Sequence, residues 1–255
     1  SGLILLIRTA NMVVDPIYPP ILLGIIGLAA LTTAVSWIAG RNGVASRSFW
    51  ILGMGWFVLS AAVYAKPEVA LAWSLACLLP GGLLFLSRSD QSSRFPLHLL
   101  GLAAISTVPL TTSWIGINLY SPAEVARKNI YIPVFLLAHA LFLAGYAFHS
   151  SQFVKTFPET ERWVKASNSL GLALLPIIHF LLGWWSLPNS PSSPPTLWLV
   201  PVISIGLAFL FWMARKRGNF IQAYGDVGLR LFSFTWFFRL LGAIDKGIRR
   251  ILGWI

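Results

Sequence analysis

The amino-acid sequence predicts an all-α polytopic membrane helix bundle, for three reasons. The chain has 255 residues, and its mean hydropathy of +0.74 reflects a content of 56% hydrophobic residues. Charged residues make up 11% of the chain, whereas a typical soluble domain has about 25%. Seven long apolar spans contain no Asp, Glu, Lys or Arg, and about 20 such residues cross a bilayer as a helix.

The seven spans form one expected transmembrane bundle within residues 1–218. The segment 1–7 is apolar but too short to span, and we interpret it as the end of a helix that begins upstream, so that the chain would be a fragment or a half-length relative. The third span contains Pro80 followed by two glycines, which predicts a kink. The expected spans lie near 21–39, 49–65, 69–87, 96–120, 131–149, 166–186 and 196–213.

The fourth span has the composition of a broken membrane helix. Pro109 removes a backbone donor, and the hydroxyl groups of Thr111, Thr112 and Ser113 can bond the carbonyl groups that lose their partners. We therefore predict a helix break near mid-membrane. The alternative is a packing irregularity without function, because Pro and Gly are frequent in membrane helices generally.

The basic residues predict the orientation of the chain, whose formal net charge is +11. Ten basic residues follow the odd-numbered spans, namely Arg41, Arg47, Arg88, Arg94, Lys155, Arg162, Lys165, Arg215, Lys216 and Arg217. Four lie on the other side, namely Arg8, Lys66, Arg127 and Lys128. Because cytoplasmic loops are enriched in Lys and Arg, we expect the C-terminus on the cytoplasmic side of a bacterial inner membrane or an equivalent energy-coupling membrane.

Residues 219–255 form a second expected unit, an amphipathic helix that lies in the membrane interface. Its apolar face carries Trp236, Leu240, Ile244, Ile248 and Ile251. Its basic face carries Arg239, Lys246, Arg249 and Arg250. With Arg215, Lys216 and Arg217, these basic residues are expected to contact anionic lipids or a partner subunit rather than nucleic acid. The alternative is an eighth span with Arg239 buried, which is costly in a bilayer.

Few side chains in the spans can titrate or bind a metal. The single Cys77 excludes an intrachain disulfide, and we expect no catalytic residue, metal site or cofactor. His139 and His179 lie well inside the fifth and sixth spans and are the candidates for an ion path. The alternatives are that each is a neutral histidine bonded to a neighbouring helix, or that the two bind haem.

Several motifs follow the order of a known family. The chain has Ser-Gly-Leu-Ile-Leu-Leu-Ile-Arg at 1–8, Gly-Ile-Ile-Gly-Leu-Ala-Ala-Leu-Thr at 24–32, a Leu-Gly pair at 52–53, Leu-Leu-Phe-Leu at 83–86 and Val-Pro-Leu-Thr-Thr-Ser-Trp-Ile-Gly at 108–116. This order resembles the antiporter-like membrane subunits of respiratory complex I, membrane-bound hydrogenases and Mrp-type sodium/proton antiporters. The resemblance covers about residues 1–120 and implies sibling membrane subunits as partners.

The chain departs from the family where protonable residues are expected. In the family, lysines and histidines of this half form a chain of proton sites through the membrane. The corresponding positions here hold neutral or apolar residues, namely Asn42, Gly43, Trp73, Cys77, Gly81 and Ile117. A proton path needs groups that titrate, so we expect the path to be lost in this half.

These observations predict a non-catalytic membrane subunit of a complex I-like or antiporter-like assembly. One alternative is an active proton-translocating or cation-translocating subunit whose charged residues lie in a missing upstream half. Another is a membrane anchor that binds quinone or haem near His139 and His179.

Overall fold

The computed structural model describes residue 4 and residues 18–40, 43–87, 95–121, 131–151, 162–186 and 195–217. Within these residues every regular element is a helix. The elements are α2 (Tyr18–Ala39), α3 (Gly43–Val63), α4 (Pro67–Leu86), α5 (Phe95–Ile105), α6 (Thr112–Gly116), η2 (Ile117–Tyr120), α7 (Ile132–Ser150), α8 (Arg162–Ser186), η4 (Pro195–Trp198) and α9 (Leu199–Arg217). The expected amphipathic helix at 219–255 lies outside the described residues.

The predicted polytopic membrane bundle is confirmed. Six of the described helices, α2, α3, α4, α7, α8 and α9, are long and apolar enough to cross a membrane. The expected fourth span is not a seventh continuous helix. It consists of the 11-residue α5, the 5-residue α6 and the 4-residue η2. At 1.5 Å per residue, α5 is about 16 Å long, so it reaches only about halfway through the hydrocarbon core.

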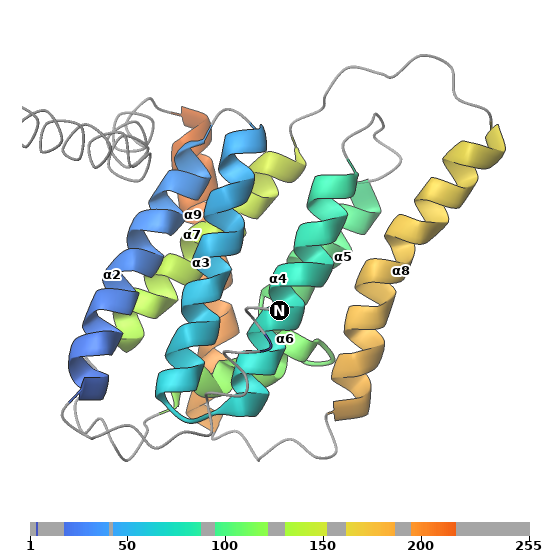
Figure 1. The fold of residues 1–255 in the computed structure, drawn as a ribbon. Helices are drawn as coiled ribbons and strands as arrows, with labels where there is room; N and C mark the ends of the chain where they lie inside the picture. The colour runs from blue at the N-terminus through green and yellow to red at the C-terminus, as the bar shows by residue number, and fades with distance from the viewer. Residues whose placement is uncertain are drawn as a thin grey trace, which may run out of the picture.

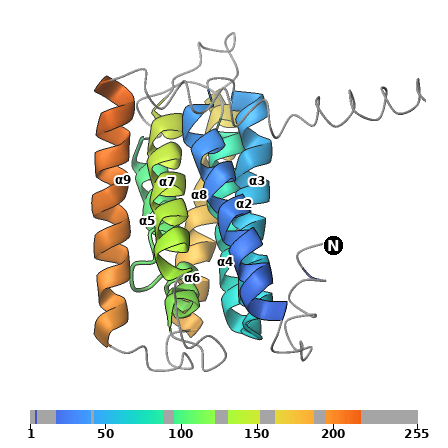
Figure 2. The ribbon, with the colours of Figure 1, turned by 90° about the vertical axis from the view of Figure 1, so that its left-hand side faces the viewer.

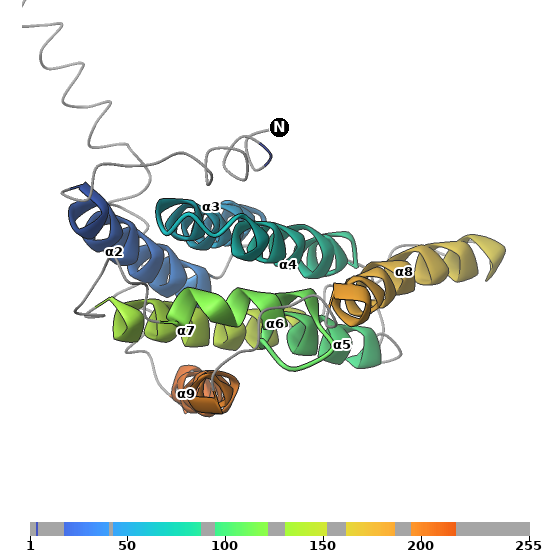
Figure 3. The ribbon, with the colours of Figure 1, turned by 90° about the horizontal axis from the view of Figure 1, so that it is seen from below.

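The helices stand side by side in two rows (Figure 1). Figure 3, seen from below, shows α2, α3 and α4 in one row and α7, α6 and α5 in the other. Helix α9 packs on the outer side of α7 (Figure 2), and α8 closes one end of the bundle against α4, α5 and α6. The broken segment therefore lies between α4, α7 and α8.

Aromatic side chains fill the space between the two rows. Trp37, Trp50 and Trp73 are each 1% exposed or less. Their indole N–H groups donate to the carbonyl oxygens of Phe142, Cys77 and Gly116, at 3.2, 3.1 and 3.2 Å. Such bonds matter here because a buried indole N–H needs an acceptor and lipid offers none.

Small residues let these rings approach the neighbouring backbone. A Cβ atom at Gly81 of α4 would collide with the indole of Trp50, and one at Gly145 of α7 would collide with the indole of Trp37. Small residues at helix contacts are the usual solution in membrane bundles, where van der Waals packing holds the helices together. At Gly81 the space beside the backbone is thus occupied by an aromatic ring.

Candidate functional site

The candidate site is the break between α5 and α6, where Thr111, Thr112 and Ser113 form a polar cluster within an apolar span. Helix α5 ends at Ile105 and α6 begins at Thr112. Two residues of the connecting segment, Thr107 and Leu110, have φ angles of 53° and 73°. The left-handed conformation costs a non-glycine residue roughly 1–2 kcal/mol. The surrounding contacts must therefore hold the break in place.

Pro109 explains why the helix stops where it does. A proline removes the N–H that would bond the carbonyl four residues earlier, and its ring collides with that carbonyl. For Pro109 the affected carbonyl belongs to Ile105, the last residue of α5. The break therefore begins at the acceptor that the proline leaves without a donor.

Ser106 and Ser113 satisfy carbonyl groups at the end of α5. The last four carbonyl groups of a helix have no partner within it. The carbonyl oxygens of Leu102 and Ala103 accept from the backbone N–H of Ser106, at 3.1 and 3.2 Å, and also from its hydroxyl, at 2.8 and 3.1 Å. The hydroxyl of Ser113 donates to the carbonyl oxygen of Ala104 at 2.6 Å. These two serines satisfy three of the four carbonyl groups.

His139 of α7 satisfies the fourth carbonyl. Its Nε2 lies 2.8 Å from the carbonyl oxygen of Ile105, and because a carbonyl only accepts, this nitrogen carries the hydrogen. The imidazole is 1% exposed and meets the ring of Trp73 edge-on, with centroids 5.2 Å apart. It supplies the hydrogen bond that Pro109 cannot make.

His179 of α8 contacts the other side of the break. Its Nδ1 and Nε2 lie 3.0 and 2.9 Å from the hydroxyl oxygen of Thr112, the first residue of α6. The side chain is fully buried. One histidine therefore lies at the end of α5 and the other at the start of α6, each from a different helix.

Thr111 completes the polar cluster. Its hydroxyl donates to the carbonyl oxygen of Val108 at 2.7 Å and lies 2.8 Å from the hydroxyl of Ser113. The four residues predicted from the sequence, Pro109, Thr111, Thr112 and Ser113, thus all lie at the break. The ion path that we predicted through His139 and His179 remains a prediction.

Helix α8 touches the break through its backbone. A Cβ atom at Gly183 would collide with backbone atoms of Leu110 and Thr111. This glycine lies one helical turn after His179, on the same face. Sequence reasoning missed both Gly183 and Ser106. For Ser106, the available signal was a hydroxyl residue next to the predicted break.

The surroundings of the break are apolar. Cys77 and Ile117, two of the positions where the resembled family has protonable residues, are 5% and 0% exposed. Among the residues that the structure describes, no group of three His, Cys, Asp or Glu side chains could hold a metal ion. The chemistry available at the break is therefore hydrogen bonding by hydroxyl and imidazole groups.

Lys66 anchors the far end of the broken segment, and sequence reasoning had counted it only as a charge. It lies in the turn between α3 and α4, and its Nζ donates to the carbonyl oxygen of Asn118 in η2 at 2.6 Å. Burial lowers the pKa of Lys66 from its ordinary value. A single lysine in a short turn between two apolar spans was the signal available in the sequence.

Arg215 behaves differently from the expected lipid contact. It is 5% exposed, and its Nη2 donates to the carbonyl oxygen of Ala39, at the C-terminus of α2. Its guanidinium carbon lies 4.4 Å from the ring centroid of Phe148. A cation at a helix C-terminus is favourable, so Arg215 connects α9 to α2 and α7 inside the bundle.

The other expected contact residues divide into two groups. Lys216 is exposed, and its Nζ lies 4.0 Å from the ring centroid of Trp212. Arg217 ends α9. Arg239, Lys246, Arg249 and Arg250 lie outside the described residues.

Comparison with protein-family models and with curated protein sequences finds no match to this chain.

Proposed function

We propose that this chain is a non-catalytic membrane subunit of a larger complex I-like or antiporter-like assembly, and that its bundle does not conduct protons. The observation that carries the proposal is the use made of the two intramembrane histidines. His139 is bonded to the helix end at Ile105, and His179 to the hydroxyl of Thr112. Both act as structural partners of a broken helix.

A proton path would need titratable groups that hand protons on across the membrane. Glu68 is the one carboxylate among the described residues, and it lies in the first turn of α4 rather than at the break. The neighbours of His139 include Trp73 of α4, whose indole N–H is already bonded to the carbonyl oxygen of Gly116. This arrangement favours a packed, neutral interior over a proton wire.

The outer helices favour packing against sibling subunits. About half of the residues in the apolar stretches of α2, α3, α4 and α7 are buried inside the bundle, whereas only 22% are buried in α8 and 28% in α9. The free face of α8 carries large apolar side chains, including Leu170, Leu174, Leu181 and Trp185, each more than 45% exposed. In our proposal this face lies against lipid and neighbouring membrane subunits, with the C-terminus on the cytoplasmic side.

Proton conduction can be tested in proteoliposomes that contain the purified full chain and a pH-sensitive dye. We expect an imposed pH gradient to decay no faster than in protein-free vesicles, while an added uncoupler collapses it. A rapid proton flux that disappears in His179→Ala would overturn the proposal. It would instead favour the second candidate, active proton or cation translocation, for which two buried histidines beside a broken helix are the specific observation.

A further inference from the structure

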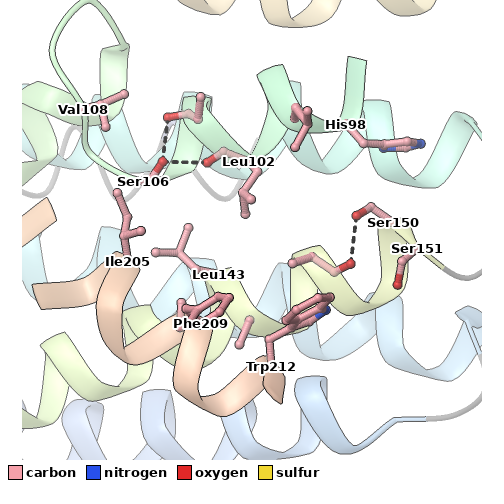
Figure 4. Close-up of a pocket in the computed structure, with 15 residues that line it drawn as sticks. His98, Leu102, Ser106, Val108, Leu143, Ser150, Ser151, Ile205, Phe209 and Trp212 are labelled. Atoms are coloured by element: carbon pink, nitrogen blue, oxygen red, sulfur yellow. Dashed lines mark hydrogen bonds between the residues drawn. The ribbon is translucent and has the colours of Figure 1, made fainter. Parts of the chain in front are cut away.

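A pocket of about 570 Å³ lies between α5, α7 and α9 (Figure 4). Its walls are mainly aliphatic and aromatic, with Leu102 from α5, Leu143 from α7, and Ile205 and Phe209 from α9. This volume falls within the usual range for sites that bind small molecules, roughly 300–1,000 Å³. Two residues of the broken segment, Ser106 and Val108, also line this pocket.

Three polar side chains of the pocket lie at one end, whereas the hydroxyl of Ser106, at the other end, is bonded to the carbonyl oxygens of Leu102 and Ala103. Figure 4 shows His98, Ser150 and Ser151 on one side, with Val108 and Ile205 on the other. Ser150 and Ser151 are at the C-terminus of α7, so the polar end lies at one end of the bundle. The shape therefore suits a molecule with one polar end and a long apolar body.

The depth of the pocket corresponds to a single leaflet. From His98 to Ser106 along α5, and from Trp212 back to Ile205 along α9, the rise is about 10–12 Å at 1.5 Å per residue. Half of a hydrocarbon core is about 15 Å. The chain turns at the break just beyond Ser106, and Val108 of that turn lines the apolar end. An acyl chain entering from one surface would thus reach the middle of the membrane and stop.

The charge near the polar end favours an anionic headgroup. Lys216 is exposed and lies one turn after Trp212, a lining residue whose ring it contacts. Within the described residues the sole carboxylate is Glu68, at the opposite end of α4 from Ser87. Ser87 in turn bonds His98 at the polar end of the pocket, at 3.2 Å. A basic group at the membrane surface attracts anionic lipid headgroups.

We propose that this pocket binds one acyl chain of an anionic phospholipid, whose headgroup lies beside Lys216. The proposal depends on the membrane placement of the bundle and not on the function proposed above. It assigns the space between α5 and α9 to an ordered lipid that belongs to the folded subunit.

The test uses the purified full chain in mild detergent, stripped of lipid and then mixed with dioleoyl phosphatidylglycerol or dioleoyl phosphatidylcholine. Native mass spectrometry counts the lipids that stay bound. We expect one phosphatidylglycerol per chain, with a roughly fivefold preference over phosphatidylcholine from one nearby lysine. Equal binding of the two lipids, or a neutral isoprenoid carried through purification in their place, would overturn the proposal.

Two variants and a control locate the site. Ala103 lines the pocket, so Ala103→Phe should fill it and abolish stoichiometric binding. Gly206 of α9 has open space where a side chain would begin, so Gly206→Phe adds a ring outside the pocket and should keep the lipid. Lys216→Gln should remove the preference for phosphatidylglycerol.

Thermal unfolding of each variant shows whether it has folded. If Ala103→Phe unfolds at a lower temperature than the parent protein, Lys216→Gln decides the question, because substitution of an exposed residue should not disturb the fold. An unchanged preference in Lys216→Gln contradicts the headgroup assignment. Lipid retention in a well-folded Ala103→Phe contradicts the pocket itself.

Discussion

His139 shows how much a single side chain can matter in a broken membrane helix. Its Nε2 replaces the backbone N–H that Pro109 lacks, and lipid has no donor to offer the carbonyl of Ile105. A buried acceptor that loses its hydrogen-bond donor destabilises the folded state by about 1–3 kcal/mol. The hydroxyl groups of the two serines at the break bond the carbonyl oxygens of Leu102, Ala103 and Ala104 instead.

We therefore expect His139→Leu to lower the free energy of unfolding by about 1–3 kcal/mol. The measurement is chemical unfolding of the purified protein in detergent, followed by circular dichroism. His139→Gln keeps an N–H donor and should recover part of the loss. If the leucine variant unfolds at the same denaturant concentration as the parent, the hydrogen bond to Ile105 is not supporting the break.

A second residue-scale prediction compares two glycines of the same helix. Gly183→Ala introduces a methyl group that collides with the backbone of Leu110 and Thr111, whereas Gly171 has open space. We expect Gly183→Ala to destabilise the protein by about 1–3 kcal/mol. Gly171→Ala should be neutral or stabilise by up to about 1 kcal/mol. Thermal unfolding of the two variants side by side gives the answer, and equal melting temperatures would refute the close approach.

The sequence could indicate residue types at the break but not their partners. Pro109 and the hydroxyl residues after it stand in one local motif, so their presence at a break was predictable. Gly183 and His179 reach the same place from more than 60 residues away, and Arg215 bonds a carbonyl 176 residues away. Such contacts depend on how the helices are arranged, which hydropathy alone does not specify. For that reason Arg215 was predicted to contact lipid or a partner subunit rather than the end of α2.

At the scale of elements, the fourth span differs from its neighbours because several local features interrupt it together. Two residues adopt the left-handed conformation, and hydroxyl groups occupy the carbonyls at the end of α5. A hydropathy window averages over this segment and counts one span. Pro109 and the hydroxyl residues after it predicted a break near mid-membrane, but not that the chain beyond the break divides into α6 and η2.

We expect Pro109→Ala to leave the break open, because restoring one N–H does not remove the bonds of Ser106, Ser113 and His139. Spin labels at positions 99 and 121, in a Cys77→Ala background, report the geometry by electron–electron double resonance. A continuous helix would separate these positions by about 33 Å. A shift to that distance in the variant would show that Pro109 alone keeps the helix broken.

At the scale of the whole molecule, α8 stands at one end of the two rows and α9 on the outer side of α7, and a smaller share of their residues is buried than in α2, α3, α4 and α7. The overall architecture was the most predictable feature, because charge-free apolar spans have few ways to satisfy their backbone in a bilayer. The arrangement of the rows was not, since all spans have similar composition and the contacts depend on particular glycines and rings.

The expected helix after residue 219 supports a prediction about assembly. Deleting 226–255 should leave the spans inserted but weaken co-purification with partner subunits, because the basic and apolar faces predicted there would no longer brace a neighbour. Pull-down from mild detergent at fixed salt, with a protease-protection assay for insertion, measures both effects. If the truncated chain assembles as tightly as the full chain, the segment does not brace a neighbour and acts only at the membrane surface.

The hydrogen bonds of the break also set an order of events during biosynthesis. The serine partners of α5 emerge from the ribosome within nine residues of the carbonyls that they bond, but His139 follows Ile105 by 34 residues and His179 follows Thr112 by 67. A nascent chain in which only α5 and α6 have been synthesised therefore has one carbonyl group, that of Ile105, without its native donor. Because Pro109 leaves this carbonyl group without a backbone donor, we expect the segment to stay beside the insertion machinery until α7 arrives.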